Sequence, residues 1–217
     1  YIPLAETIEM ILNAVQESFG SPVEIEFAVD LEKSKNNLPS FYLLQIKPLL
    51  TDQITRNIRI DSLDKSGMML YTSSSVGNGE MNDILDVIFI DNKKFNKLKT
   101  IEMAEEIEML NRKMIEQGRH YILIGPGRWG SRDRFVGIPV NWSQISHAKV
   151  IVEISLHNFP LDSSLGSHFF HNVTAMNIGY FSVQHTSKSD FIRWDILYQQ
   201  TVVQQTEFFR HVRFNDP

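Results

Sequence analysis

Two glutamates near the start of the chain have the type and the spacing of metal ligands. Glu24 and Glu26 lie two residues apart in an alternating apolar–polar segment, 22–30, which predicts a strand with one buried face. Side chains two residues apart on a strand point to the same side, so the two carboxylates should lie together. Paired carboxylates favour a hard cation such as Mg²⁺.

A second segment supplies an amide and a cation with the same spacing. Gln45 and Lys47 belong to a predicted strand at 41–47, which Pro48 ends. If this strand pairs with the first as a hairpin, its amide and ammonium groups converge on the two carboxylates. The oxygens could then hold Mg²⁺ bridging phosphates, and the lysine could neutralise charge on a transferred phosphoryl group. The alternative is the solvated polar face of an amphipathic hairpin.

A glycine- and arginine-rich segment, GPGRWGSRDR from Gly125 onward, is the most unusual part of the chain. It follows a short buried strand, as many phosphate-binding loops do. Gly125 and Gly127 would let backbone amides approach a ligand. Arg128, at the centre, and Arg132 could pair with phosphate or carboxylate. The segment matches neither a P-loop nor a Rossmann fingerprint. The alternative is a structural turn, with Asp133 as the rival partner of Arg128.

Two further histidines have the spacing of a metal site. His168 and His171 would share one face of a helix predicted at 163–176. Together with Glu153 or Asp162 they could ligate a metal ion. The alternative is a pair of ordinary, partly buried histidines.

The elements that would position these residues follow from hydrophobic periodicity. The pattern predicts helices at 4–19, 99–117, 163–176 and 190–200, and strands at 22–30, 41–47, 68–71, 86–90, 121–124, 149–154, 178–184 and 207–214. A looser stretch near 50–56 predicts two domains, 1–52 and 53–217. The fold class is therefore α/β, a mixed α+β arrangement: a helix–hairpin unit followed by a layered mixed-sheet domain with flanking helices.

The first 50 or so residues resemble a known family. The helix, the turn FGSP, the segment EIEF and the segment LQIKP resemble the C-terminal end of the ATP-grasp domain of phosphoenolpyruvate synthases and pyruvate phosphate dikinases. The resemblance implies that Glu26 is a metal ligand and that Glu24 holds the adjoining acidic position. It places Gln45 and Lys47 at the family's glutamine and arginine. Lysine keeps the charge but loses the planar fork of arginine.

This resemblance implies an ATP-dependent phosphotransferase that moves phosphate from ATP towards a pyruvate-like small molecule, with Mg²⁺ and ATP as cofactors. The family's phosphate-gripping lysine, its arginines and its adenine pocket would lie upstream of Tyr1. We therefore expect the chain to be part of a longer protein and to be inactive alone, with neither cofactor tightly bound. The alternative is a non-catalytic module that binds an anion or another domain and retains an ATP-grasp remnant.

The family also has a phosphohistidine domain whose signature, GGxTSHA, opens a helix. Ile145-Ser-His-Ala matches only the end of that signature, because no glycine pair precedes His147. The segment that follows, 149–154, favours a strand. A histidine at the start of a strand is the favoured interpretation, and phosphohistidine is the alternative. The GPGRWGS segment is similar to segments in the C-terminal regions of large, phosphoenolpyruvate synthase-like bacterial proteins. This resemblance covers much of 55–217 and implies no established chemistry.

Composition limits the class of protein. Of 217 residues, 42% are hydrophobic and 22% charged, which is typical of a globular protein. The net charge of −5, without a basic stripe, argues against a nucleic-acid partner. Cysteine is absent, so disulfides and thiolate metal sites are excluded. No apolar run approaches the roughly 20 residues of a membrane helix, and no signal-peptide pattern is present. We expect a cytoplasmic protein with no membrane partner.

Overall fold

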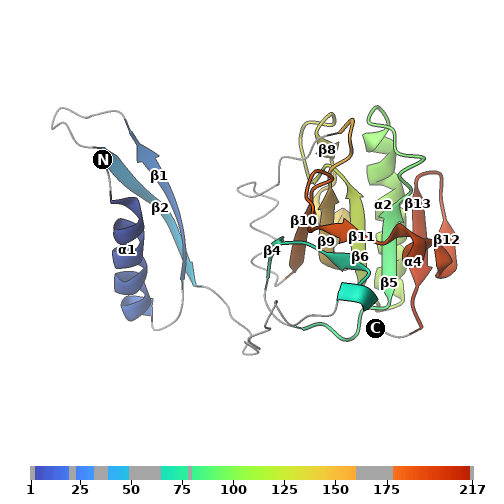
Figure 1. The fold of residues 1–217 in the computed structure, drawn as a ribbon, viewed down its shortest axis with the longest axis horizontal. Helices are drawn as coiled ribbons and strands as arrows, with labels where there is room; N and C mark the ends of the chain where they lie inside the picture. Colours follow the sequence, from blue (N-terminus) through green and yellow to red (C-terminus); the bar gives the residue numbers. More distant parts are fainter. Residues whose placement is uncertain are drawn as a thin grey trace. The chain divides into compact units, whose positions relative to one another are not determined.

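The computed structural model describes residues 3–19, 23–31, 39–48, 65–77, 80–159 and 178–215. The chain divides into two units, Tyr1–Ile54 and Thr55–Pro217, close to the boundary predicted after residue 52 (Figure 1). Both units contain helices and strands, so the protein is mixed α/β, as predicted from the pattern of periodicities. No helix in the described ranges is long and apolar enough to cross a membrane.

The first unit is one helix beside one hairpin. Helix α1 (Leu4–Phe19) contacts β1 (Val23–Asp30), and β1 pairs antiparallel with β2 (Ser40–Pro48). The rings of Phe27 and Phe41 stack across the two strands with centroids 5.0 Å apart. A bulge interrupts the register between Glu26 and Phe27. The hairpin that the alternating segments predict is therefore present.

A seven-stranded sheet forms the centre of the second unit, in the order β12-β13-β5-β6-β9-β10-β4. Its strands are β4 (Ser74–Val76), β5 (Asp86–Ile90), β6 (Tyr121–Pro126), β9 (Ala148–Ile154), β10 (Gly179–Val183), β12 (Thr201–Gln205) and β13 (Phe209–Arg213). The four central strands, β5-β6-β9-β10, run parallel, and the other neighbours pair antiparallel. The carboxyl ends of the four parallel strands therefore share one edge (Figure 1).

Helix α2 (Thr100–Glu116) packs on one face of this sheet (Figure 1). Its buried side chains recur at helical spacing and form one cluster with the sheet residues of that face: Met103, Ile107, Leu110, Met114, Ile88, Ile90, Leu123 and Ile151. The 3₁₀ turn η3 (Trp142–Ile145) contacts the same helix. Burial of these apolar side chains holds α2 against the face of the sheet. The carboxyl edge of the parallel strands is then lined by loops.

The opposite face has a thinner cover. A two-stranded ribbon, β3 (Leu70–Tyr71) with β11 (Phe191–Ile192), and helix α4 (Trp194–Gln199) supply it. The ring of Phe89 meets those of Trp194 and Tyr198 at 5.8 and 5.6 Å. The unit thus has three layers, with the sheet in the middle.

One predicted helix is mostly wrong, and one strand was not predicted. The helix predicted at 190–200 is only the six residues of α4, because Phe191 and Ile192 pair with Tyr71 and Leu70 instead. The polar segment at 201–205, which the periodicity leaves unassigned, is the edge strand β12. The 3₁₀ turn η2 (Lys65–Gly67) and the two-residue strands β7 (Arg128–Trp129) and β8 (Gly137–Ile138) also have no counterpart in the periodicity. The helix predicted at 163–176 lies outside the described residues.

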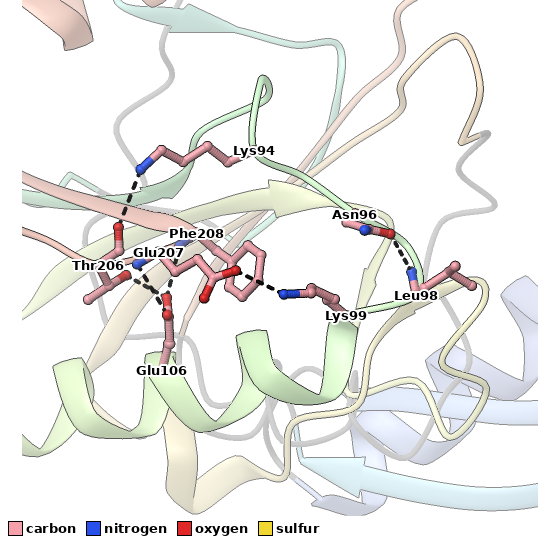
Figure 2. A network of polar contacts seen from close by, with 8 residues as sticks. All are labelled: Lys94, Asn96, Leu98, Lys99, Glu106, Thr206, Glu207 and Phe208. Carbon is pink, nitrogen blue, oxygen red and sulfur yellow. Dashed lines mark hydrogen bonds and ion pairs between the residues drawn. The ribbon is translucent and has the colours of Figure 1, made fainter.

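A polar network ties α2 to the turn between β12 and β13 (Figure 2). Glu106 accepts hydrogen bonds from the Thr206 hydroxyl at 2.5 Å and from the Phe208 amide at 3.1 Å. The Glu207 amide also donates to Glu106, at 3.2 Å, and the Glu207 carboxylate pairs with Lys99 at 3.0 Å. The Glu106 carboxylate thus accepts the hydrogen bonds of one hydroxyl and two backbone amides in this turn, so its role is structural.

Candidate functional site

The carboxyl edge of the parallel strands is where open α/β sheets bind ligands. Four loops leave the sheet there. They begin at Asp91 after β5, Gly127 after β6, Ser155 after β9 and Gln184 after β10. The GPGRWGS segment, selected for its composition, therefore lies at the edge where a ligand is expected.

A buried carboxylate fixes the start of this segment. The Trp129 amide donates to Glu153 Oε1 at 2.9 Å, and the Tyr180 hydroxyl donates to Glu153 Oε2 at 2.5 Å. All three residues are buried. The Trp129 indole also donates to the Val152 carbonyl at 3.4 Å. Three sheet residues thus hold the loop in one position, which is what a preorganised site requires.

The amides of the loop are already used by the protein. Those of Gly127, Arg128 and Gly130 donate to the carbonyls of Ile154, Val136 and Ile138 at 3.0, 3.1 and 2.9 Å. With Trp129 bonded to Glu153, every amide from 127 to 130 has a protein acceptor. The prediction that these amides turn towards an anion is therefore wrong. An anion at this loop would be held by side chains.

The glycines of the loop leave room for protein, not for a ligand. Gly127 has φ +74°, and a Cβ there would lie 2.3 Å from a ring carbon of Phe159. A Cβ at Gly125 would lie 2.4 Å from the Trp129 ring. Packing therefore explains both residues.

The predicted arginines occupy different environments. Arg128 is half-buried in β7, whereas Arg132 is exposed in the turn beyond it. The rival partner, Asp133, is used within the loop, where its carboxylate accepts the Phe135 amide at 2.9 Å. Arg128 lies closer to the sheet edge in the chain, just after β6, and Arg132 lies further along the loop.

The hairpin brings together the residues that its spacing selected. Glu24 stands opposite Lys47, and Glu26 stands opposite Gln45. Directly opposite residues of antiparallel strands have Cβ atoms about 4.5–5.5 Å apart on one face. Glu26 and Gln45 are exposed, while Glu24 and Lys47 are half-buried. The predicted pairing of the two strands is confirmed, and its register sets the two carboxylates opposite the amide and the ammonium group.

The oxygen atoms of these side chains are of the type that binds Mg²⁺, but they are too few to complete its coordination shell. Two carboxylates and an amide oxygen are hard ligands, and Mg²⁺ keeps several waters or phosphate oxygens in addition. Within the described ranges, no group of three or more His, Asp or Glu side chains is placed to hold a metal ion. The hairpin could therefore contribute part of a magnesium site that phosphates and other residues complete.

The remaining predicted histidines receive less support. His147 immediately precedes β9 and opens no helix, and its amide donates to Asn111 Oδ1 at 3.0 Å. Burial, together with the nearby His120 and Lys149, lowers the pKa of His147. His168, His171 and Asp162 lie outside the described residues.

Three residues that the sequence patterns did not indicate also meet at this edge: Ser155, His157 and His185. Ser155 Oγ lies 2.7 Å from Nδ1 of His185, whose amide donates to the same oxygen at 2.6 Å. The ring of His157 lies 6.0 Å from that of His185. Each of these residues closely follows a predicted buried strand, and this position was the available signal.

No protein-family model, curated protein or solved structure matches this chain. The hairpin and the carboxyl edge therefore carry the functional argument.

Proposed function

We propose that the first unit is the end of an ATP-grasp nucleotide-binding domain in a phosphoenolpyruvate synthase-like phosphotransferase. The observation that supports this proposal is the hairpin register, which sets Glu26 opposite Gln45 and Glu24 opposite Lys47. A random polar face would not be expected to combine two carboxylates, a neutral oxygen and a cation in this order.

Each of the four side chains then has a role. Glu26 is the metal ligand, and Glu24 adds negative charge beside it. Gln45 offers a neutral oxygen, and Lys47 neutralises charge on the transferred phosphoryl group. ATP and Mg²⁺ would be bound together with parts of the domain upstream of this chain. The chain alone supplies one wall of the cleft and is expected to be inactive.

The test replaces Glu26 with Gln in the longer protein that contains this chain. Glu26→Gln should lower Mg-ATP turnover by about 10²–10³-fold, the range for losing one stabilising group where charge develops. A coupled assay of ATP consumption measures this loss. Circular dichroism should show an unchanged fold, because the side chain is exposed.

Asp30→Asn is the matched control. It makes the same carboxylate-to-amide change on the same strand, four residues further along, or about 13 Å. Turnover of this variant should stay near the wild-type value. If Glu26→Gln retains turnover within a few-fold of the control, the hairpin is structural and the proposal fails.

A second candidate function, a non-catalytic anion-binding module, is favoured by the second unit. The supporting observation is that the GPGRWGS loop is held in one position at the carboxyl edge and contains the half-buried Arg128. In this case Arg128 holds a phosphate or carboxylate group by charge and paired hydrogen bonds. Domain–domain contact through a carboxylate would use the same chemistry.

Arg128→Ala tests this candidate through phosphate titration. We expect the affinity for inorganic phosphate, followed by the NMR shift of the Trp129 indole proton, to fall by about tenfold or more, because a hydrogen bond to a charged group is lost. Arg112→Ala, an exposed change on α2, is the control and should leave the affinity unchanged. Identical weak responses from wild type and Arg128→Ala would end this candidate.

A further inference from the structure

Two exposed histidines meet at the carboxyl edge of the sheet. His157 follows β9 and His185 follows β10, and these strands are parallel neighbours, so their loops leave the sheet side by side. The two rings stand nearly perpendicular, with centroids 6.0 Å apart. We propose that His157 and His185 form an open binding site for a transition-metal cation of the Zn²⁺ class, with Ser155 as the positioning residue.

Ser155 orients one of the two rings. Its oxygen accepts the His185 amide at 2.6 Å and lies 2.7 Å from His185 Nδ1. The oxygen retains a second lone pair, which can accept a proton carried by Nδ1. In that tautomer the lone pair of the ring is on Nε2, on the side away from Ser155. Metal-binding histidines are commonly held in this way, by a hydrogen bond at the nitrogen that does not ligate.

The spacing of the rings suits one shared ion. Nitrogen–zinc bonds of about 2.0–2.1 Å place the centroids of two ligating imidazoles about 5–6 Å apart. Imidazole favours Zn²⁺, Cu²⁺ and Ni²⁺ over Mg²⁺ and Ca²⁺. Two protein ligands leave coordination positions for water or for an oxygen of a bound phosphate or carboxylate. This site is therefore chemically distinct from the oxygen ligands of the hairpin.

A nucleophilic serine fits the same residues less well. Only 5% of Ser155 is exposed, and its oxygen already accepts a backbone amide. A nucleophile needs an accessible oxygen and a base free to take its proton. Metal ligation uses instead the exposed sides of His157 and His185.

A second histidine pair in the unit provides the control. The rings of His120 and His147 lie 5.2 Å apart. However, Nδ1 of His120 lies 3.3 Å from the His147 carbonyl, and Nδ1 of His147 is buried without a partner in the described ranges. This pair has close rings and a partner for one Nδ1, but both of its rings are half-buried, whereas those of His157 and His185 are exposed.

The experiment titrates the whole chain with Zn²⁺ by calorimetry. Loss of an outer-shell partner of a metal ligand typically weakens metal binding by roughly 10–100-fold, and Ser155→Ala should weaken Zn²⁺ binding within that range. His157→Gln and His185→Gln each remove a ligand and should weaken Zn²⁺ binding by at least as much. Ser155→Thr, which keeps the hydroxyl, should restore affinity. Before Zn²⁺ is added, nitrogen-15 NMR should show the Nδ1–H tautomer of His185 in the wild type and a mixture of tautomers in Ser155→Ala.

His120→Gln should bind Zn²⁺ like the wild type. The proposal is overturned if the wild type shows no Zn²⁺ binding or if affinity survives both single replacements. It is also overturned if His120→Gln loses as much affinity as His157→Gln. If Ser155→Ala misfolds, His157→Gln and His185→Gln still test the proposal, because they change exposed side chains.

Discussion

Gly127→Ala is expected to destabilise the second unit by about 2–5 kcal/mol. A residue with a side chain in the left-handed region costs roughly 1–2 kcal/mol, and overpacking a filled site costs about 1–3 kcal/mol more. Both apply here, because φ is +74° and the added Cβ would lie 2.3 Å from Phe159 and 2.7 Å from the Val136 carbonyl. The carbonyl belongs to the backbone and cannot rotate away. Denaturant unfolding followed by tryptophan fluorescence measures the effect.

Gly118→Ala separates backbone strain from packing. Gly118 also has a positive φ, +61°, where α2 ends, but an added Cβ there meets nothing within 4 Å. This variant should lose only about 1–2 kcal/mol, the strain alone. The three tryptophans all lie in the second unit, so one signal reports both variants. Equal losses from the two variants would show that packing at Gly127 is not tight.

The comparison of these two glycines explains why one functional prediction from the sequence was wrong. A loop rich in glycine has the same composition whether its glycines make room for a ligand or for a neighbouring side chain. At Gly127 the neighbour is Phe159, and at Gly125 it is Trp129. Both neighbours are set by tertiary contacts, which local spacing does not contain. The position of the loop after a buried strand was predictable, and the direction of its amides was not.

The hairpin was predictable because both of its requirements are local. Alternation along β1 predicts which side chains share a face, and pairing with the next strand requires only a turn. The β3–β11 ribbon is the opposite case. Phe191 and Ile192 pair with residues about 120 positions earlier, so no window of sequence containing them shows their partners. Their apolar character was therefore assigned to a helix.

A buried ionic cluster was also invisible in the sequence. Asp86, at the start of β5, is 0% exposed and accepts hydrogen bonds from His211 at 2.7 Å, Arg119 at 2.7 Å and Arg213 at 2.8 Å. Arg213 stands directly opposite Asp86 across β13 and β5, whereas Arg119 precedes β6. Three strands must assemble before these groups meet. The cluster lies at the amino edge of the parallel strands, opposite the candidate site.

Asp86→Asn is therefore expected to cost about 3–5 kcal/mol, the range for breaking a buried charge pair. The amide has nearly the same shape, but it leaves two arginines, each with 34% of its side chain exposed, without their anion. Asp133→Asn is the control, because Asp133 is exposed and accepts a hydrogen bond within its own loop. Its effect should stay near 0.5 kcal/mol, as for most surface changes.

Wild type and Asp86→Asn should differ in their free energy of unfolding by an amount that depends on pH. This dependence identifies the charge of Asp86 as the cause of the lost stability. Burial raises the pKa of Asp86, but hydrogen bonds from His211, Arg119 and Arg213 outweigh it and lower the pKa from 3.8 to about 2. The unfolded chain thus binds a proton first as pH falls, so the stabilisation is complete above about pH 4 and is lost towards pH 2. From the shift, this part amounts to about 2 kcal/mol.

Other carboxyl groups titrate in both proteins, so subtracting the two curves leaves the contribution of Asp86. The free energy of unfolding should therefore differ most between wild type and Asp86→Asn at pH 5. The difference should shrink by about 2 kcal/mol as pH falls to 2. Asp133→Asn should run parallel to wild type throughout. If the Asp86→Asn curve also runs parallel, the loss of stability comes from the changed hydrogen-bonding pattern of the amide and not from the missing charge.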